Sequence, residues 1–67
     1  MNNINILNIE AGMKFYDERN GRYITVDSVD KASKTVSCTV TEYDEEENEI
    51  TTNTLFNIGE IRHFEER

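Results

Sequence analysis

The seven residues from 35 to 41 alternate strictly between polar and apolar side chains. Val36, Cys38 and Val40 take every second position, and each intervening residue is a threonine or a serine. Side chains of a β-strand point alternately to opposite faces, so this pattern predicts a strand with one buried and one solvated face. Its β-branched content favours the same conformation. Cys38 is therefore interpreted as a small core residue rather than as a nucleophile.

An earlier part of the chain predicts a hairpin. Residues 13–16 alternate, and residues 23–26 do so again. Between them lie Asn20 and Gly21, a pair that favours the positive φ angles of a tight hairpin turn. Val29 is out of phase with residues 23–26.

A β-bulge near residues 27–28 would restore the phase of Val29. The polar residues 30–34 then predict a turn into the strand 35–41.

The remainder of the chain predicts further short elements. Residues 49–56 indicate a fourth strand, whose inward face is ambiguous because Leu55 is out of phase with Ile50 and Phe56. Residues 57–61 suit a single 3₁₀ turn, and residues 62–65 suit a last short strand with Phe64 inward. Residues 1–11 are predicted to form an extra strand or a short helical turn.

The apolar residues of these elements define the expected core. Its members are Met13, Phe15, Ile24, Val26, Val29, Val36, Val40, Ile50, Ile58, Ile61 and Phe64.

The order of these elements resembles an SH3-like small β-barrel. The resemblance covers residues 12–65, from the opening segment Gly12 to Tyr16 through Asn20-Gly21 to the short turn from Ile58 to Ile61. It implies an all-β, mainly antiparallel fold with five strands and a 3₁₀ turn before the last one. Members of that fold class bind peptides, modified tails, RNA or DNA, so the resemblance implies a binding role without naming the ligand.

The size of the chain limits what it can do. With 67 residues it forms one domain, and we expect that domain to comprise residues 1–67. A domain this small rarely builds both a core and the deep pocket of a small-molecule enzyme. One cysteine and one histidine provide neither a disulfide nor a zinc site. We therefore expect no catalytic residues, no metal and no cofactor.

The N-terminus lacks the positive start and continuous apolar stretch of a signal peptide. No apolar run approaches the length of a membrane span. These features predict a cytoplasmic protein that does not associate with membranes.

Charge is distributed unevenly along the chain. Fourteen acidic residues oppose seven basic ones, for a net charge of −7. Residues 1–41 carry five of each, so the whole excess belongs to residues 42–67, with nine acids and two bases. An acidic body repels phosphate, which disfavours direct nucleic-acid binding.

The acidic run between the third and fourth predicted strands is the main candidate site. The expected partner-binding residues are Tyr43, Asp44, Glu45, Glu46, Glu47 and Glu49. Five carboxylates at one hairpin tip could dock on a basic groove in place of nucleic-acid phosphates. The plainer interpretation is that charge gathers at a tip because tips are solvated. Alternate Asp44, Glu46 and Asn48 also resemble calcium ligands, but the glycine and distal glutamate of an EF-hand are missing.

A second candidate is the set of basic residues near two predicted loops, which comprises Arg19, Arg22, Lys31 and Lys34. With Tyr16 and Tyr23 exposed, these could bind RNA or single-stranded DNA by base stacking and phosphate contact. Acidic residues are interleaved with them, so a salt-bridged surface is the default interpretation.

The sequence thus favours a non-enzymatic module that binds a protein with a basic surface. In size, charge and lack of catalytic groups it resembles the small acidic inhibitors of phages and mobile elements, including DNA-mimicking anti-restriction and anti-CRISPR proteins. Two alternatives stay open: an SH3-like nucleic-acid-binding module, and a structural subunit that assembles through an open sheet edge. The oligomeric state does not follow from the sequence.

Overall fold

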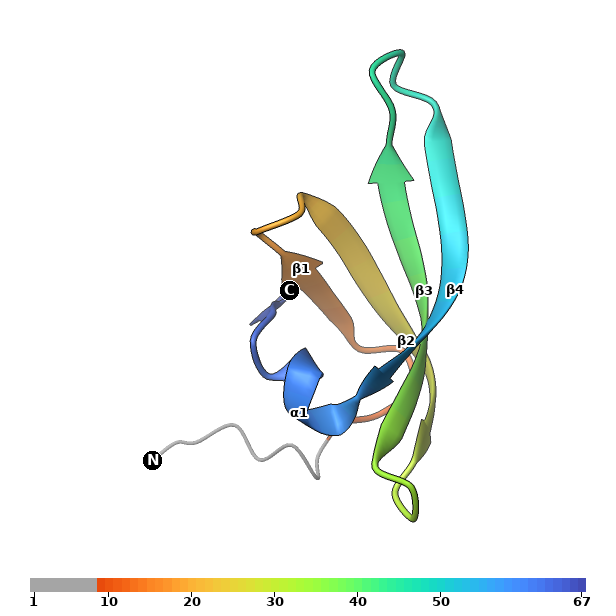
Figure 1. Cartoon of the computed structure of the whole chain (residues 1–67), viewed down its shortest axis with the longest axis vertical. Helices are drawn as coiled ribbons and strands as arrows, with labels where there is room; N and C mark the ends of the chain where they lie inside the picture. Colours follow the sequence, from red (N-terminus) through yellow and green to blue (C-terminus); the bar gives the residue numbers. More distant parts are fainter. Residues whose placement is uncertain (1–8) are drawn as a thin grey trace.

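The computed structural model of the chain describes residues 9–67 (Figure 1). Five strands form one antiparallel sheet in the order β4-β3-β2-β1-β5. Their bounds are β1, Lys14–Asp17; β2, Arg22–Asp30; β3, Thr35–Tyr43; β4, Glu49–Asn57; and β5, Glu65–Glu66. One helical turn, α1, Ile58–Ile61, connects β4 to β5. Within residues 9–67, no helix has the length and apolar character to cross a membrane.

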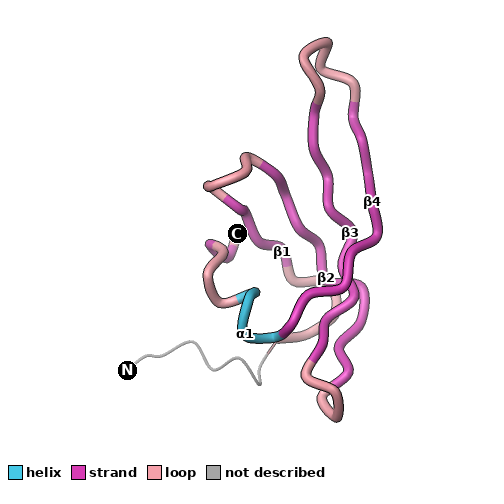
Figure 2. Tube along the Cα trace, viewed as in Figure 1, coloured by secondary structure: helices cyan, strands magenta, loops and turns pink. Residues whose placement is uncertain are grey.

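The sheet is open. β4 and β5 are its two outer strands and do not pair with each other (Figures 1 and 2). The predicted antiparallel five-stranded architecture is therefore confirmed, but its closure into a barrel is wrong. β5 has only two residues, and the far half of β4 leads away from it, so no ladder can form between them.

The first hairpin is held by pairing of β1 with β2. Phe15 lies opposite Ile24 and Asp17 lies opposite Arg22, which leaves residues 18–21 as the loop. This loop is longer than the tight turn expected at Asn20-Gly21, and of that pair only Gly21 has a positive φ, 65°. A glycine is favoured there because it has no Cβ to oppose the left-handed conformation.

The predicted bulge in β2 is confirmed. The register with β3 shifts between Val26 and Ser28, so that Asp27 is extra. The shift returns Val29 to the inner face opposite Val36. Asp27 accepts a hydrogen bond from the Thr39 hydroxyl at 2.7 Å.

Alternation along β3 is also confirmed, because Val36, Cys38 and Val40 are all buried. In β4, Phe56 is buried and Leu55 is 67% exposed, which settles the ambiguity of phase. The placement of Ile50 in the core was wrong, since its side chain is 47% exposed. It lies opposite Glu42 in β3, beyond the last residue at which β2 pairs with β3.

One core lies on the inner face of the sheet, beneath α1. Its buried members are Ile9, Phe15, Ile24, Val26, Val36, Cys38, Val40, Phe56, Ile58 and Ile61, with Met13, Val29 and Phe64 packed against them. Ile9 belongs to the segment 1–11 that was predicted as a strand or helical turn; residues 1–8 lie outside the described part.

The segment after β4 differs slightly from expectation. Residues 58–61 form a single α-helical turn rather than a 3₁₀ turn. The Glu60 carboxylate accepts the Asn57 N–H at 2.9 Å, which satisfies a donor at the start of the turn. The last strand begins at Glu65, and Phe64 before it is half-buried against the core.

Candidate functional site: an acidic hairpin tip

The β3–β4 hairpin extends far beyond the core (Figures 1 and 2). Pairing of β3 with β2 ends where Thr41 lies opposite Tyr23, so the hairpin continues past that point with only two strands. Every residue from 43 to 50 is exposed. We call residues 43–49 the acidic tip, and it contains all six residues predicted to bind a partner.

Asp44 shapes the acidic tip. One of its carboxylate oxygens accepts the N–H groups of Glu46 and Asn48, both at 2.8 Å. These hydrogen bonds favour the charged carboxylate, and that to the Asn48 N–H contributes most, so the pKa of Asp44 is lowered. Glu47 has a φ of 64°, a left-handed conformation that is uncommon for a residue other than glycine. The Asp44 side chain therefore stabilises the conformation of the turn.

The other carboxylates of the acidic tip are free to face a partner. Glu45, Glu46, Glu47 and Glu49 are all exposed, and no ion pair in the described residues involves the acidic tip. Tyr43 is 56% exposed, and its hydroxyl lies 3.5 Å from a Glu49 carboxylate oxygen. Sequence reasoning placed these groups at one tip, and the structure brings them together there.

The alternative of a calcium site at Asp44, Glu46 and Asn48 gains no support. The Asn48 side-chain amide donates to Asp44 at 3.3 Å and to Glu46 at 3.4 Å, which joins the three side chains to one another. Among residues 9–67, no group of three His, Cys, Asp or Glu side chains is arranged to hold a metal ion.

The four basic candidate residues fall into two separate pairs. Arg19 and Arg22 lie at the β1–β2 loop, where β2 begins, whereas Lys31 and Lys34 lie in the β2–β3 turn, where β2 ends. A nine-residue strand is roughly 27 Å long, and Figure 1 shows the two loops at opposite ends of it. The structure therefore does not gather these residues into one surface.

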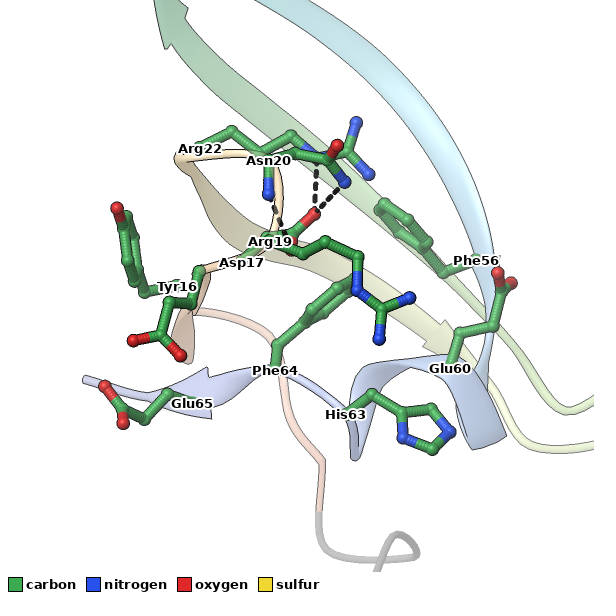
Figure 3. A pocket seen from close by; sticks show the side chains of 11 residues that line it. Tyr16, Asp17, Arg19, Asn20, Arg22, Phe56, Glu60, His63, Phe64 and Glu65 are labelled. Carbon is green, nitrogen blue, oxygen red and sulfur yellow. Dashed lines mark hydrogen bonds and ion pairs between the residues drawn. The ribbon is translucent and has the colours of Figure 1, made fainter.

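A groove that the sequence did not predict lies between the β1–β2 loop and the segment from α1 to β5 (Figure 3). Its volume is about 620 Å³, and Phe56 and Phe64 meet in it edge to face, with ring centroids 5.5 Å apart. Arg19 extends across the groove (Figure 3). The two phenylalanines are far from the arginines in sequence, so no local pattern could reveal their contact.

Four carboxylates also line this groove, on Asp17, Glu18, Glu60 and Glu65. His63, the only histidine, stands at its rim beside Glu60 (Figure 3). The groove is thus mixed in charge, unlike the acidic tip.

Asp17 anchors the loop at one side of the groove. It is 3% exposed and accepts hydrogen bonds from the Asn20 side chain at 2.8 Å and the Arg22 Nε at 2.9 Å. Burial raises the pKa of Asp17, but the bonds from Asn20 and Arg22 together outweigh it, so the pKa is lowered overall. The Arg22 guanidinium also lies 5.8 Å from the Phe56 ring centroid, a cation–π contact. Arg22 therefore makes contacts that stabilise the fold.

The two tyrosines considered for base stacking contact each other, and Tyr23 stays 50% exposed. The rings of Tyr16 and Tyr23 pack on each other with centroids 4.9 Å apart. The Arg67 guanidinium covers the Tyr16 ring at 4.8 Å from its centroid.

Cys38 is a core residue, as its position in β3 suggested. It is fully buried, and desolvation, with a smaller contribution from the nearby Asp27 charge, raises the pKa of its thiol to about 11. A thiol needs to be ionised to act as a nucleophile, so at neutral pH Cys38 stays protonated.

Comparisons with protein families, with characterised proteins and with solved structures gave no match to this chain. Any assignment of function therefore depends on the charges and geometry described above.

Proposed function

We propose that this protein is a non-enzymatic protein-binding module that docks its acidic tip on a basic surface of another protein. The observation that carries the proposal is the position of Glu45, Glu46, Glu47 and Glu49. They stand together at the end of a projecting hairpin, exposed and without a basic counter-ion among residues 9–67. A concentrated charge in that position is accessible to a partner from several directions.

The overall charge distribution favours the same docking direction. The molecule measures 39 × 24 × 16 Å, and the acidic tip lies at one end of its long axis, opposite the turn that carries Lys31 and Lys34 (Figure 1). An approaching basic surface is therefore attracted to one end of the molecule. Such steering raises association rates at low salt and is screened at high salt.

In its more specific form, the partner is a bacterial nucleic-acid enzyme, and the acidic tip takes the place of phosphates in its groove. The protein would then act in the cytoplasm as an inhibitor of the phage or mobile-element type. An SH3-like arrangement supports a binding role: the strand order β4-β3-β2-β1-β5 with a helical turn before the last strand is compatible with it.

The test is capture of a partner from host lysate by the tagged protein, at low and at high salt, with mass spectrometry of the eluate. The chain with Glu45, Glu46, Glu47 and Glu49 all changed to Gln should lose a basic nuclease or polymerase that the natural chain retains at low salt. A variant with Glu10, Glu18, Glu65 and Glu66 changed to Gln removes the same charge elsewhere and should retain the partner. Equal capture by all three chains would overturn the proposal.

A second candidate function, a nucleic-acid-binding module, is favoured by one observation: Arg19 extends over a groove that contains Phe56 and Phe64 (Figure 3). Aromatic rings beside a cation can bind a nucleobase and its phosphate, but Phe56 is buried and only Phe64 is partly exposed. The four carboxylates of the groove oppose it. Fluorescence anisotropy with RNA and DNA oligonucleotides at low salt decides the matter, and an absence of binding removes this candidate.

A further inference from the structure

The outer edge of β4 presents unpaired backbone groups. Two backbone bonds flank the β3–β4 ladder: Asp44 N–H donates to Asn48 O at 3.1 Å, and Ile58 N–H donates to Lys34 O at 2.9 Å. Hydrogen-bonded pairs alternate along an antiparallel ladder, and this ladder has no register shift. The β4 residues that bond to β3 are therefore Ile50, Thr52, Thr54 and Phe56.

The alternate residues of β4 point their N–H and C=O groups away from β3. The two at the ends of the strand are Glu49 and Asn57, and Asn57 donates its N–H to Glu60, at 2.9 Å. The three that lie between these ends are Thr51, Asn53 and Leu55. Thr51, Asn53 and Leu55 have no such partner among the described residues, because β4 is the last strand on its side of the sheet. No other segment of residues 9–67 runs along this edge (Figure 1). Three donors and three acceptors thus face outward in one row.

This edge lacks the usual protection against pairing. Natural edge strands are commonly short, or carry lysine, proline or a bulge. β4 has nine residues, no proline and no bulge, and no charged side chain after Glu49. Two of its apolar side chains, Ile50 and Leu55, are exposed by 47% and 67%.

We propose that β4 pairs with β4 of a second copy of this chain, antiparallel, with Asn53 on the two-fold axis. The N–H of Asn53 then donates to the C=O of Asn53 in the second copy, which returns the same hydrogen bond. Thr51 exchanges the same two hydrogen bonds with Leu55 of the second copy. All three outward-facing residues are satisfied in both copies. The two sheets become one continuous ten-stranded sheet.

The side chains fit this register. Ile50 faces Phe56 of the second copy on the inner face, which extends the apolar core across the axis. Leu55 faces Thr51 on the outer face, so both exposed apolar residues of β4 become covered. Opposed side chains of this kind stabilise an antiparallel pair.

Charge selects the direction of pairing. In the antiparallel arrangement, Glu49 lies opposite Asn57, and the two acidic tips point to opposite ends of the dimer. Parallel pairing would place the two acidic tips side by side, where like charges repel. If the axis lay at residue 52, Leu55 would lie opposite Glu49. If it lay at residue 54, Thr51 would lie opposite Asn57. In either case, one of the three residues Thr51, Asn53 and Leu55 would no longer pair with a member of that set.

The pairing involves few side chains, so the dimer is expected to be weak. Interfaces below about 1,200 Å² are typical of transient association. We expect dimers at protein concentrations on the order of 100 µM, which corresponds to roughly 5–6 kcal/mol of association free energy. This inference does not rest on the proposed function, because no carboxylate of the acidic tip takes part.

Sedimentation velocity over a range from about 10 µM to about 1 mM tests the proposal. The natural chain should shift from monomer to dimer, and Asn53→Pro should stay monomeric, because proline has no N–H to donate and its ring blocks the edge. Asn53→Ala keeps the N–H and should dimerise like the natural chain. A natural chain that is monomeric at 1 mM, or equal dimerisation by Asn53→Pro, would overturn the proposal.

Cross-linking tests the register and does not require proline to be accommodated. In Asn53→Cys, the two introduced cysteines lie directly opposite each other, about 5.5 Å apart at Cα, a distance that a disulfide spans. In Thr51→Cys, they lie four residues apart along the strands, roughly 14 Å, which is too far. Mild oxidation should produce covalent dimer from Asn53→Cys and not from Thr51→Cys. The reverse result, or equal yields, would contradict this register; Cys38 does not interfere because it is buried.

Discussion

Two of the three hairpin loops, β1–β2 and β3–β4, use the same hydrogen-bonding arrangement in opposite settings. Asp17 begins the β1–β2 loop and binds Asn20, and Asp44 begins the β3–β4 loop and binds Asn48. Asp17 is buried and paired with Arg22 at 2.9 Å, whereas Asp44 is exposed among other carboxylates.

The same turn chemistry therefore contributes differently to the molecule. In the β1–β2 loop it links the buried Asp17 carboxylate to the core, because Arg22 forms an ion pair with Asp17 and also packs on Phe56. In the β3–β4 loop it only sets the shape of a tip that contacts nothing else in the described chain. We expect substitutions in the β1–β2 loop to alter folding, and substitutions in the β3–β4 loop to alter binding.

The largest expected difference comes from one matched pair of substitutions. Ile24→Ala removes a fully buried side chain and should cost about 3 kcal/mol of unfolding free energy, through lost burial and a cavity. That is much of what a domain of this size possesses, about 3–10 kcal/mol. Ile50→Ala removes a half-exposed side chain of the projecting hairpin and should cost less than about 0.5 kcal/mol.

Urea unfolding followed by circular dichroism, at about 5 µM so that the chain is monomeric, measures both changes. Similar losses for the two variants would mean that the projecting hairpin is part of the cooperative core.

The two aspartates give the next largest difference. Asp17→Asn leaves the Arg22 charge half-buried without its partner and should cost about 2 kcal/mol, as hydrogen bonds to charged groups do. Asp44→Asn should change the urea midpoint much less, because the turn it shapes packs on no other segment of residues 9–67. A larger loss for Asp44→Asn than for Asp17→Asn would reverse the comparison.

The pH dependence of stability distinguishes the natural chain from Asp17→Asn. The pKa of Asp17 is lower in the folded chain than in the unfolded one, so its stabilisation is present above the unfolded value, about 3.9, and is lost as pH falls through the folded value. Between pH 5 and pH 2, the natural chain should therefore lose more stability than Asp17→Asn does. Parallel pH profiles would show that Asp17 is not the group responsible.

The sequence predicted those parts of the fold that depend on neighbours in the chain. Alternation identified β3, the phase of Val29 identified the bulge, and the run after Tyr43 identified the acidic tip. Each of these is a local pattern whose physical cause lies within a few residues.

The features that it missed depend on segments far apart in the chain. Phe56 and Phe64 form the groove only because α1 turns the chain back toward the β1–β2 loop. Ile50 was assigned to the core by its phase, but phase alone does not reveal where the neighbouring β2 ends. Closure of the sheet likewise depends on the length of β5 and the direction of β4, which no periodicity encodes.

The smallest expected effects concern backbone conformation in the same two loops. Glu47 and Gly21 have nearly equal φ angles, 64° and 65°, but only one of them is glycine. Gly21→Ala should destabilise the chain by about 1 kcal/mol, because a side chain is strained at this angle. The added Cβ itself would meet only the Tyr16 hydroxyl, at 4.0 Å, so the cost belongs to the backbone.

Glu47→Gly removes the same strain from the acidic tip and should stabilise the hairpin by about 0.5 kcal/mol, because the gain is partly offset by the greater freedom of glycine in the unfolded chain. Glu47→Gln, which removes the charge and keeps the strain, is its control in urea unfolding. If both Glu47 variants gained equally, relief of charge repulsion would account for the change. If neither gained while Gly21→Ala lost stability, the end of the projecting hairpin would be energetically separate from the core, and its conformation would then matter for the partner alone.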